Sequence, residues 1–295
     1  MKPVTHRREL LRLVLLAPLA SACTEVRSGG VIAPPPSPEV DALERQLLEL
    51  LLGERRKQGL GTLERDAELD AVARAHSVDM REARFFAHDS PNTGSLEDRL
   101  DRAGQLTLVA RENLGEGPDP ERTHAGLMAS PGHRANILAG DVSHVGIGVV
   151  RGGVADPANL LVTQVFATKV EPLSADEARG ELERRIDEAR KQKGLPALPR
   201  DARLDELAAW AVGKLPDDLA TAATRSIADG VVRELGPQTK WSSVALVSAA
   251  FVHPRLYTVP PSLLTADIRA AGLATGPGRD PRGRELVKLA LLVAR

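Results

Sequence analysis

The chain has 295 residues, more than one typical domain of about 100–200 residues, so we expect two modest domains rather than one large one. Hydrophobic residues make up 42% and charged residues 27%, with a formal net charge of -1, which is typical of a globular body and gives no reason to expect a nucleic-acid partner. Only 4 Phe, 2 Trp and 1 Tyr are present, so the cores must depend on Leu, Val and Ala, and few rings remain to stack on bases.

The N-terminus has the pattern of an export signal. Basic residues precede an apolar run at residues 13–22, which is too short to cross a bilayer, so residues 1–22 are predicted to be a signal peptide. The segment Arg7-Arg8-Glu9-Leu10-Leu11-Arg12 also resembles a twin-arginine signal, and the choice between the general and the twin-arginine export route stays open.

Cys23, the only cysteine, directly follows this segment. Residues 19–23 resemble a bacterial lipobox, in which the cysteine is lipidated and becomes the new N-terminus, although Ala20 stands where leucine is usual. Plain secretion is the alternative. We favour a lipid anchor to the membrane, facing the periplasm or the exterior, because an unpaired thiol is a liability in an oxidising compartment. Residues 23–38 include a proline run and are predicted to form an extended tether.

Helices dominate the first part of the predicted domain. Apolar residues recur at three- and four-residue spacing over residues 39–58 and again over residues 66–84, a pattern that buries one helix face. Asp66 is in position to cap the second helix. Three more capping residues, two of them followed by proline, predict short helices. They are Ser95, Asp119 and Ser130.

Two strands are expected after these helices, at residues 145–150 and 160–170, and in the second of them Val162, Gln164 and Phe166 alternate with the β-branched residues Thr163 and Val165. The short turn at Gly152-Gly153 makes an antiparallel pair the expected arrangement. Residues 39–171 are therefore predicted to form an α+β domain with helices packed on a small sheet.

A second unit is predicted at residues 175–295. Residues 55–74 and residues 190–209 align without a gap and share ten identities in twenty. We interpret this as an internal duplication, with a smaller, degenerate α+β copy following the first.

Six short segments of the first unit carry most of its polar motifs, in a fixed order. The segments are Ala75-His76-Ser77-Val78-Asp79-Met80, Phe86-Ala87-His88-Asp89-Ser90-Pro91, Arg111-Glu112-Asn113-Leu114, Ser130-Pro131-Gly132-His133-Arg134-Ala135-Asn136-Ile137-Leu138, His144-Val145-Gly146-Ile147-Gly148-Val149 and Thr163-Gln164-Val165-Phe166. Together they resemble the bacterial branch of the CAP superfamily, also called SCP domains, which includes plant pathogenesis-related proteins, insect venom antigens and cysteine-rich secretory proteins. The resemblance implies an α-β-α sandwich, an extracytoplasmic location and an open cleft containing histidines and acids.

By motif position, the resemblance assigns His88, Glu112 and His133 to the cleft, with His144 as the fourth member. Leu127 stands where these domains usually have tryptophan.

Residue-level reasoning leaves alternatives open for several of these positions. His76 shares a helical stripe with apolar residues and is interpreted as a core histidine. Glu112 is either a cleft residue or a structural acid that accepts backbone N–H groups. His133 lies in a first helical turn, where the helix dipole favours a neutral ring.

His88, His133 and Glu112 could together hold a divalent metal such as Zn²⁺ and leave a position open for water. The sequence contains no His-Glu-x-x-His helix and no Gly-x-Ser-x-Gly nucleophile motif, so no catalytic residue is assigned and catalysis itself stays open.

Three functions are compatible with these motifs. The leading hypothesis is an envelope lipoprotein that binds a lipid, a glycan or a wall fragment in its His/Glu cleft. The alternatives are a metal-assisted hydrolase of peptide or peptidoglycan bonds and a structural envelope protein. The second unit lacks the polar motifs and has His253 as its one histidine, so it is not expected to contain a second site.

Overall fold

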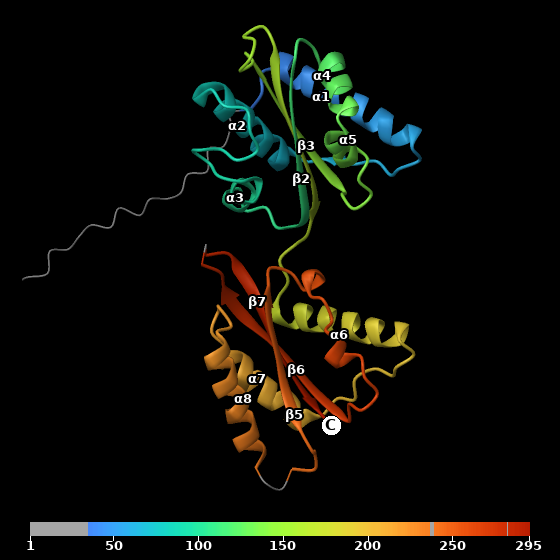
Figure 1. Ribbon diagram of the computed structural model, residues 1–295, viewed down its shortest axis with the longest axis vertical. Coiled ribbons are helices and arrows are strands. Elements are labelled where there is room, and N and C mark those ends of the chain that lie inside the picture. The colour runs from blue at the N-terminus through green and yellow to red at the C-terminus, as the bar shows by residue number, and fades with distance from the viewer. Residues whose placement is uncertain (1–34, 237–238, 282) are drawn as a thin grey trace, which may run out of the picture.

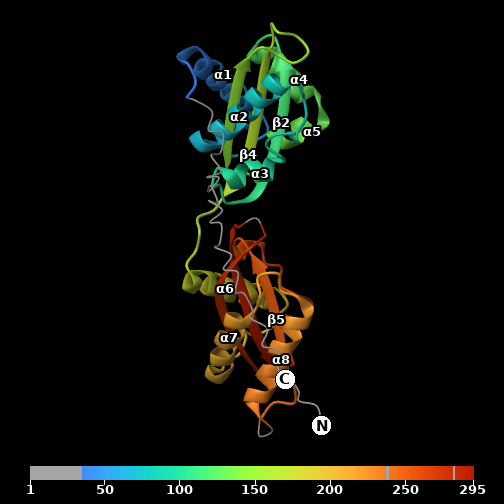
Figure 2. The same cartoon turned by 90° about the vertical axis from the view of Figure 1, so that its left-hand side faces the viewer.

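The computed structural model describes residues 35–236, 239–281 and 283–295. The predicted signal peptide, Cys23 and the tether up to residue 34 lie outside the described residues. Two units follow one another along the long axis of the molecule and are joined by a short segment between Lys169 and Ala175 (Figures 1 and 2). In the described part of the chain, no helix is both long and apolar enough to span a membrane.

The first unit contains five helices and four strands among its described residues. They are α1 (Pro38–Lys57), β1 (Glu64–Arg65), α2 (Ala67–Ala83), α3 (Leu96–Arg102), β2 (Thr107–Gly117), α4 (Pro120–Ala129), α5 (Pro131–Ile137), β3 (His144–Arg151) and β4 (Leu160–Lys169). The sheet has the order β1-β3-β4-β2, in which β1 is parallel to β3 and the other pairs are antiparallel.

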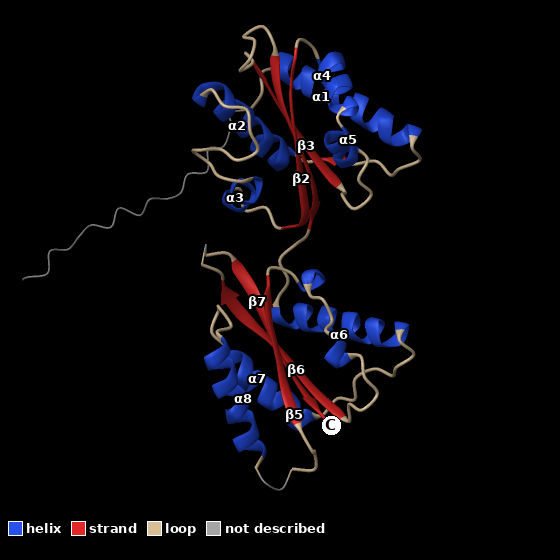
Figure 3. Ribbon diagram, viewed as in Figure 1, coloured by secondary structure: helices blue, strands red, loops and turns tan. Residues whose placement is uncertain are grey.

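The sheet of the first unit is covered on both faces (Figure 3). One core cluster packs α1, α4 and α5 against the sheet around Leu47, Leu127 and Phe166. Two smaller clusters pack α2 and α3 against the opposite face. Since apolar side chains of the strands alternate between these clusters, both faces of the sheet are buried. The predicted α+β class and the α-β-α sandwich are confirmed.

The expected helix starts are explained by side-chain caps. Asp66 accepts hydrogen bonds from the backbone of Glu68 and Leu69, and Ser95 forms a reciprocal capping box with Asp98. Ser130 is the exception, because it occupies the N-cap position of α5 without a side-chain cap bond. The strand β2, which the sequence analysis did not predict, carries the Glu112-Asn113 motif.

A buried ionic network joins α1, α2 and β3. The Glu44 side chain is fully buried and accepts hydrogen bonds from Arg74 at 2.8 and 2.9 Å, from Arg65 at 2.8 Å and from the Val149 N–H at 3.2 Å. Asp70 accepts from Arg65 and from the Ile147 N–H, both at 2.7 Å. Each buried carboxylate is thereby paired with a guanidinium and a backbone donor, which compensates for its loss of water.

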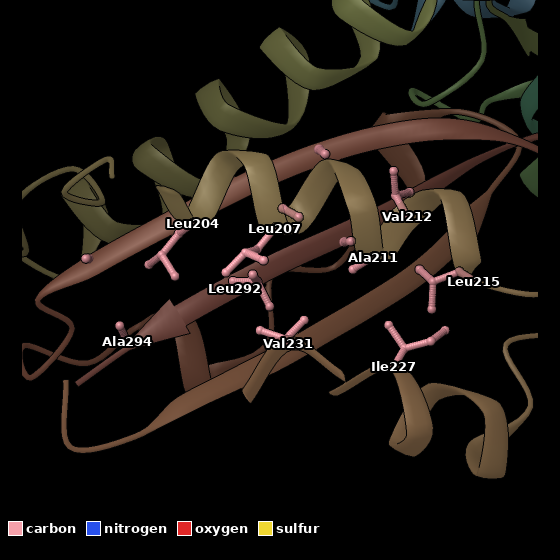
Figure 4. Packing of buried hydrophobic residues seen from close by; sticks show 13 residues of the cluster. Leu204, Leu207, Ala211, Val212, Leu215, Ile227, Val231, Leu292 and Ala294 are labelled. Atoms are coloured by element: carbon pink, nitrogen blue, oxygen red, sulfur yellow. The ribbon is translucent and has the colours of Figure 1, made fainter. Parts of the chain in front are cut away.

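The second unit is built from three helices, two 3-10 turns and three strands among its described residues. They are α6 (Ala175–Gln192), α7 (Ala202–Lys214), α8 (Thr221–Leu235), β5 (Val244–Phe251), η1 (Pro254–Leu256), η2 (Pro261–Leu263), β6 (Ala270–Arg279) and β7 (Glu285–Ala294). Its antiparallel sheet has the order β5-β7-β6, and the cluster shown in Figure 4 packs α7 and α8 against one face. The opposite face packs against α6.

Several contacts of the first unit recur in the second. The Arg55 guanidinium donates to the carbonyls of Gly61, Ile137 and Ala139, and the Arg190 guanidinium donates to those of Pro196, Leu263 and Thr265. Asp201 caps α7 as Asp66 caps α2, and a parallel bridge between Arg200 and Ala271 stands where β1 pairs with β3. The two units therefore share their strand order and the packing of a helix on each face of the sheet, α1 and α2 in the first unit and α6 and α7 in the second.

The first prediction concerns the buried network. Replacing Glu44 with alanine leaves two arginines without their buried partner and should lower the free energy of unfolding by about 3–5 kcal/mol. The matched control is Glu39→Ala, which removes an exposed ion pair with Arg151 and should cost less than about 1 kcal/mol. Urea denaturation of the two variants measures both values, and equal losses would contradict the role assigned to the network.

Candidate functional site

The side chain of Glu112 lies at the centre of the candidate site. It extends from β2, its side chain is 3% exposed, and its two oxygens have different partners. One oxygen accepts a hydrogen bond from His88 Nδ1 at 2.9 Å, and the other accepts one from Arg99 at 2.5 Å. Glu112 is therefore an acid engaged by side chains, and the alternative of an acid that binds the N–H groups of the following turn is wrong.

His88 lies on the segment between α2 and α3, which side chains hold in place. Asp79 of α2 accepts hydrogen bonds from Ser90, Asn92 and Thr93. Arg99 donates to the carbonyl of His88 at 2.9 Å and to that of Gly94 at 2.9 Å. The guanidinium of Arg99 thus fixes the backbone of His88 and the carboxylate of Glu112 together, a role that sequence spacing did not reveal.

His76 is the second histidine beside this carboxylate. It is fully buried on α2, with Nε2 at 3.1 Å from the carbonyl of Ala87 and at 4.0 Å from Glu112. Burial lowers the pKa of His76, so its neutral form is favoured. Its position on an apolar helical stripe predicted a hydrogen-bonded core histidine. The structure supports that reading, and it also places the ring against the site.

The ring of His88 is 56% exposed, in contrast to its acidic partner. Because Nδ1 donates to Glu112, Nε2 is the nitrogen left for a ligand or for water. The hydrogen bond that His88 donates to Glu112 raises the pKa of His88 and so favours the charged imidazolium. The site can present either a neutral acceptor or a cationic donor, depending on pH.

His133 approaches the same strand from α5. Its carbonyl accepts a hydrogen bond from Asn113 at 3.1 Å, and Asn136 donates to the Glu112 carbonyl at 3.1 Å and to Asn113 at 2.9 Å. Burial, and to a smaller extent the charge of His88, lowers the pKa of His133. A neutral ring was predicted from the helix dipole, but burial is the main cause. Within the described residues, His133 Nδ1 has no hydrogen-bond partner.

His144 does not join this cluster. It begins β3, where Nδ1 lies 2.8 Å from the hydroxyl of Ser143 and Nε2 lies 3.8 Å from Glu64. The strand β4 separates β3 from β2 in the sheet order. His144 therefore makes no contact with His88, Glu112 or His133, and its prediction as the fourth cleft residue is wrong. Arg99 is the residue that contacts Glu112 in addition to the histidines.

The predicted metal triad does not fit the observed arrangement. Both oxygens of Glu112 are engaged, one by His88 and the other by the cationic guanidinium of Arg99, which competes with a metal ion for the carboxylate. In the part of the chain that the structure describes, no group of three His, Cys, Asp or Glu residues is placed to hold a metal ion. His88, His133 and Glu112 are accordingly not a preformed metal site.

A cavity of about 900 Å³ lies elsewhere, between the two units. Helix α3 and the start of β2 form one wall, and the β6–β7 hairpin forms another. An ion pair of 3.3 Å between Asp101 and Arg284 connects the two walls. None of the site residues described above lines this cavity.

Comparisons with known proteins agree with the fold of the first unit. Residues 48–166 match the model of the CAP family, described as the cysteine-rich secretory protein family. Two curated relatives come from Bacillus subtilis. The protein YkwD is 41% identical over 115 residues, which are 39% of this chain and 45% of YkwD. The membrane protein YlbC is 39% identical over 109 residues, which are 37% of this chain and 32% of YlbC. The chain thus spans less than half the length of either relative.

Similar solved structures include an extracellular protein with an SCP domain from Bacillus anthracis, at 30% identity and a TM-score of 0.41, covering 46% of this chain and 45% of that one. An outer surface protein of Borrelia burgdorferi has 21% identity and a TM-score of 0.39, covering 43% of this chain and 92% of that one. The family match and the identity to YkwD show that residues 48–166 are a domain of the CAP superfamily, of bacterial type.

The second prediction tests the His88–Glu112 contact. Glu112→Gln should lower the pKa of His88, because the carboxylate raises it in the folded protein. Because the pKa of His88 is raised in the folded protein, the contact makes its full contribution to stability at pH values below the ordinary histidine pKa. That contribution is lost as the pH rises through the raised pKa. NMR titration of the imidazole measures the shift.

Asp89→Asn is the control for this titration, since Asp89 raises the pKa of His88 less than Glu112 does and its removal should change that pKa little. An unchanged pKa of His88 in Glu112→Gln would show that the hydrogen bond is not formed in solution.

Proposed function

We propose that the first unit is a ligand-binding CAP domain of the cell envelope, and that it binds through His88, Glu112 and His133. The observation that carries this proposal is the contrast within the His88–Glu112 pair. A buried carboxylate holds one nitrogen of a ring that is 56% exposed, so the other nitrogen is oriented and accessible. A histidine needed only for packing would be buried as a whole, as His76 is.

The charge of the site favours a ligand with an anionic or hydrogen-bond-accepting group. Glu112 favours the imidazolium form of His88, and Arg99 neutralises Glu112. Phospholipid headgroups and wall fragments carry phosphate or carboxylate groups that an imidazolium binds. Among the three ligand classes considered, an anionic lipid or a wall fragment therefore fits this site better than a neutral glycan.

Binding is favoured over metal-assisted hydrolysis by the geometry of Glu112. A hydrolase that used His88, His133 and Glu112 as metal ligands would need a free carboxylate oxygen, and Arg99 and His88 engage both. A purely structural envelope role remains the outcome if the site binds nothing.

We also propose that the second unit is a duplicated copy that has lost the site. Gly146 and Gly272 occupy equivalent positions in the two sheets, because each lies against the backbone at the start of the helix that packs on it, α2 or α7. The residues paired across the strands at these two glycines can therefore be compared one by one. They are Glu112, Val165 and Gly146 in the first unit and Leu246, Leu292 and Gly272 in the second. Leu246 thus stands in the position of Glu112, so the copy keeps the scaffold and lacks the acid.

Export and membrane anchoring complete the proposal and rest on the N-terminal sequence. In this arrangement the tether holds the first unit away from the membrane, and the site faces the periplasm or the exterior.

The third prediction tests ligand binding directly. The two probes are soluble muropeptides and, separately, vesicles that contain phosphatidylglycerol. His88→Ala and Glu112→Gln should each weaken binding of the recognised probe by at least about tenfold, equivalent to about 1.4 kcal/mol. His144→Ala is the matched control, because His144 lies outside the cluster and should leave affinity unchanged. If all three variants bind like the unchanged protein, the site is not the binding surface and the structural role becomes the leading explanation.

The fourth prediction tests the anchor. Cys23→Ser should move the protein from the membrane fraction to the soluble fraction and abolish labelling by an alkyne fatty acid. If the unchanged protein is recovered in the soluble fraction without label, it is secreted rather than anchored.

A further inference from the structure

The strand β5 leaves one edge of the second unit's sheet open. It is the first strand in the order β5-β7-β6, and in the described residues it pairs with β7 alone, in an unbroken antiparallel register from Val244 to Phe251. An edge strand presents a row of unpaired N–H and C=O groups, which is a template for pairing with another strand.

The register identifies which groups point outward. Ser243 and Arg295 exchange two backbone hydrogen bonds, at 3.4 and 3.0 Å, so they form a hydrogen-bonded pair. Such pairs alternate along an antiparallel ladder, which assigns Ala245, Val247, Ala249 and Phe251 to bonds with β7. The outward N–H and C=O groups therefore belong to Val244, Leu246, Ser248 and Ala250.

The corresponding edge of the first unit is covered. There, β2 is the edge strand, and Asn136 of α5 donates to the carbonyl of Glu112. Helices α4 and α5 occupy the connection between β2 and β3 and pack against β2. In the described residues of the second unit, the connection between β5 and β6 contains only the turns η1 and η2, of three residues each. The carbonyl of Leu246, equivalent to that of Glu112, has no comparable cap there.

The composition of β5 matches a second copy of itself. Residues 242–252 contain no Asp, Glu, Lys, Arg or His, no proline and no register shift. Protected edges use such charges, prolines or bulges to prevent pairing. When a strand pairs antiparallel with its own copy around a twofold axis, every charge on the strand occurs twice on the same small surface, and a neutral strand avoids that repulsion.

Side chains on both faces of β5 would gain cover from such a partner. Val244 and Leu246 extend the cluster around α7 and α8, and Val247 and Ala249 extend the cluster around α6, yet all four are only partly buried. A neighbouring strand would bury their exposed flanks.

We propose that the chain forms a twofold dimer in which β5 pairs antiparallel with β5 of a second copy, so that two three-stranded sheets become one six-stranded sheet. The interface is distant in sequence from His88 and Glu112 and does not depend on the proposed ligand site.

Sedimentation velocity of the full chain in a non-ionic detergent tests this proposal. The unchanged chain should sediment as a dimer, and Ala245→Lys, which places a charge on an exposed side chain of the edge, should weaken the dimer by at least about tenfold. Ala209→Lys is the matched control, because it adds the same charge to an exposed position of α7 away from the edge and should leave the dimer unchanged.

Two proline variants test the register, with circular dichroism as the measure of folding. Ser248→Pro removes an outward N–H, so it should retain the fold and disrupt the dimer, whereas Ala249→Pro removes a bond to β7 and should lower the melting temperature. Hydrogen exchange adds a readout, since the amides of Leu246 and Ser248 should become protected only as the protein concentration rises. The proposal would be overturned if the chain were a monomer at every concentration, even if its edge captured a foreign strand. It would also be overturned if folded Ala245→Lys and Ser248→Pro still formed the dimer.

Discussion

The fold of the first unit depends on one buried carboxylate. Glu44 of α1 binds Arg74 of α2, Arg65 of β1 and the backbone of β3, so a single side chain fixes two helices on opposite faces of the sheet to the strands between them. Removing Glu44 would leave the buried guanidinium of Arg74 without a carboxylate, whereas Arg65 would keep its ion pairs with Asp41 and Asp70. Helix α2 carries His76 and Asp79, so the position of the site follows from that of the network.

His88 lies on a connecting segment and not on a helix, and the side chains around it hold its ring in one orientation. Asp79 organises the segment that follows α2, Arg99 holds its carbonyls, and the same guanidinium neutralises Glu112. The result is a ring with one nitrogen fixed and one exposed. The charge of such a ring depends on pH, and the acid that orients it also raises its pKa.

Much of this could be predicted from the sequence. The helix starts follow from capping residues such as Asp66 and Ser95, and the association of His88 with Glu112 followed from the family motifs. The strand β2 was missed because Arg111, Glu112 and Asn113 interrupt the apolar alternation that marks a strand. Arg99 looked like an ordinary charge on a short helix, and His144 was misplaced because strand order, which decides its neighbours, is not encoded in spacing.

The segment that forms α4 and α5 has two separate duties. It contributes the carbonyl of His133 and the side chain of Asn136 to the hydrogen bonds around Glu112 and Asn113, and its helices pack against the edge strand β2. The second unit has two short turns in the corresponding connection, so it lacks both these polar groups and the cover over the edge of its sheet. The length of one connection therefore decides both whether a unit carries these polar groups and whether the edge of its sheet is exposed.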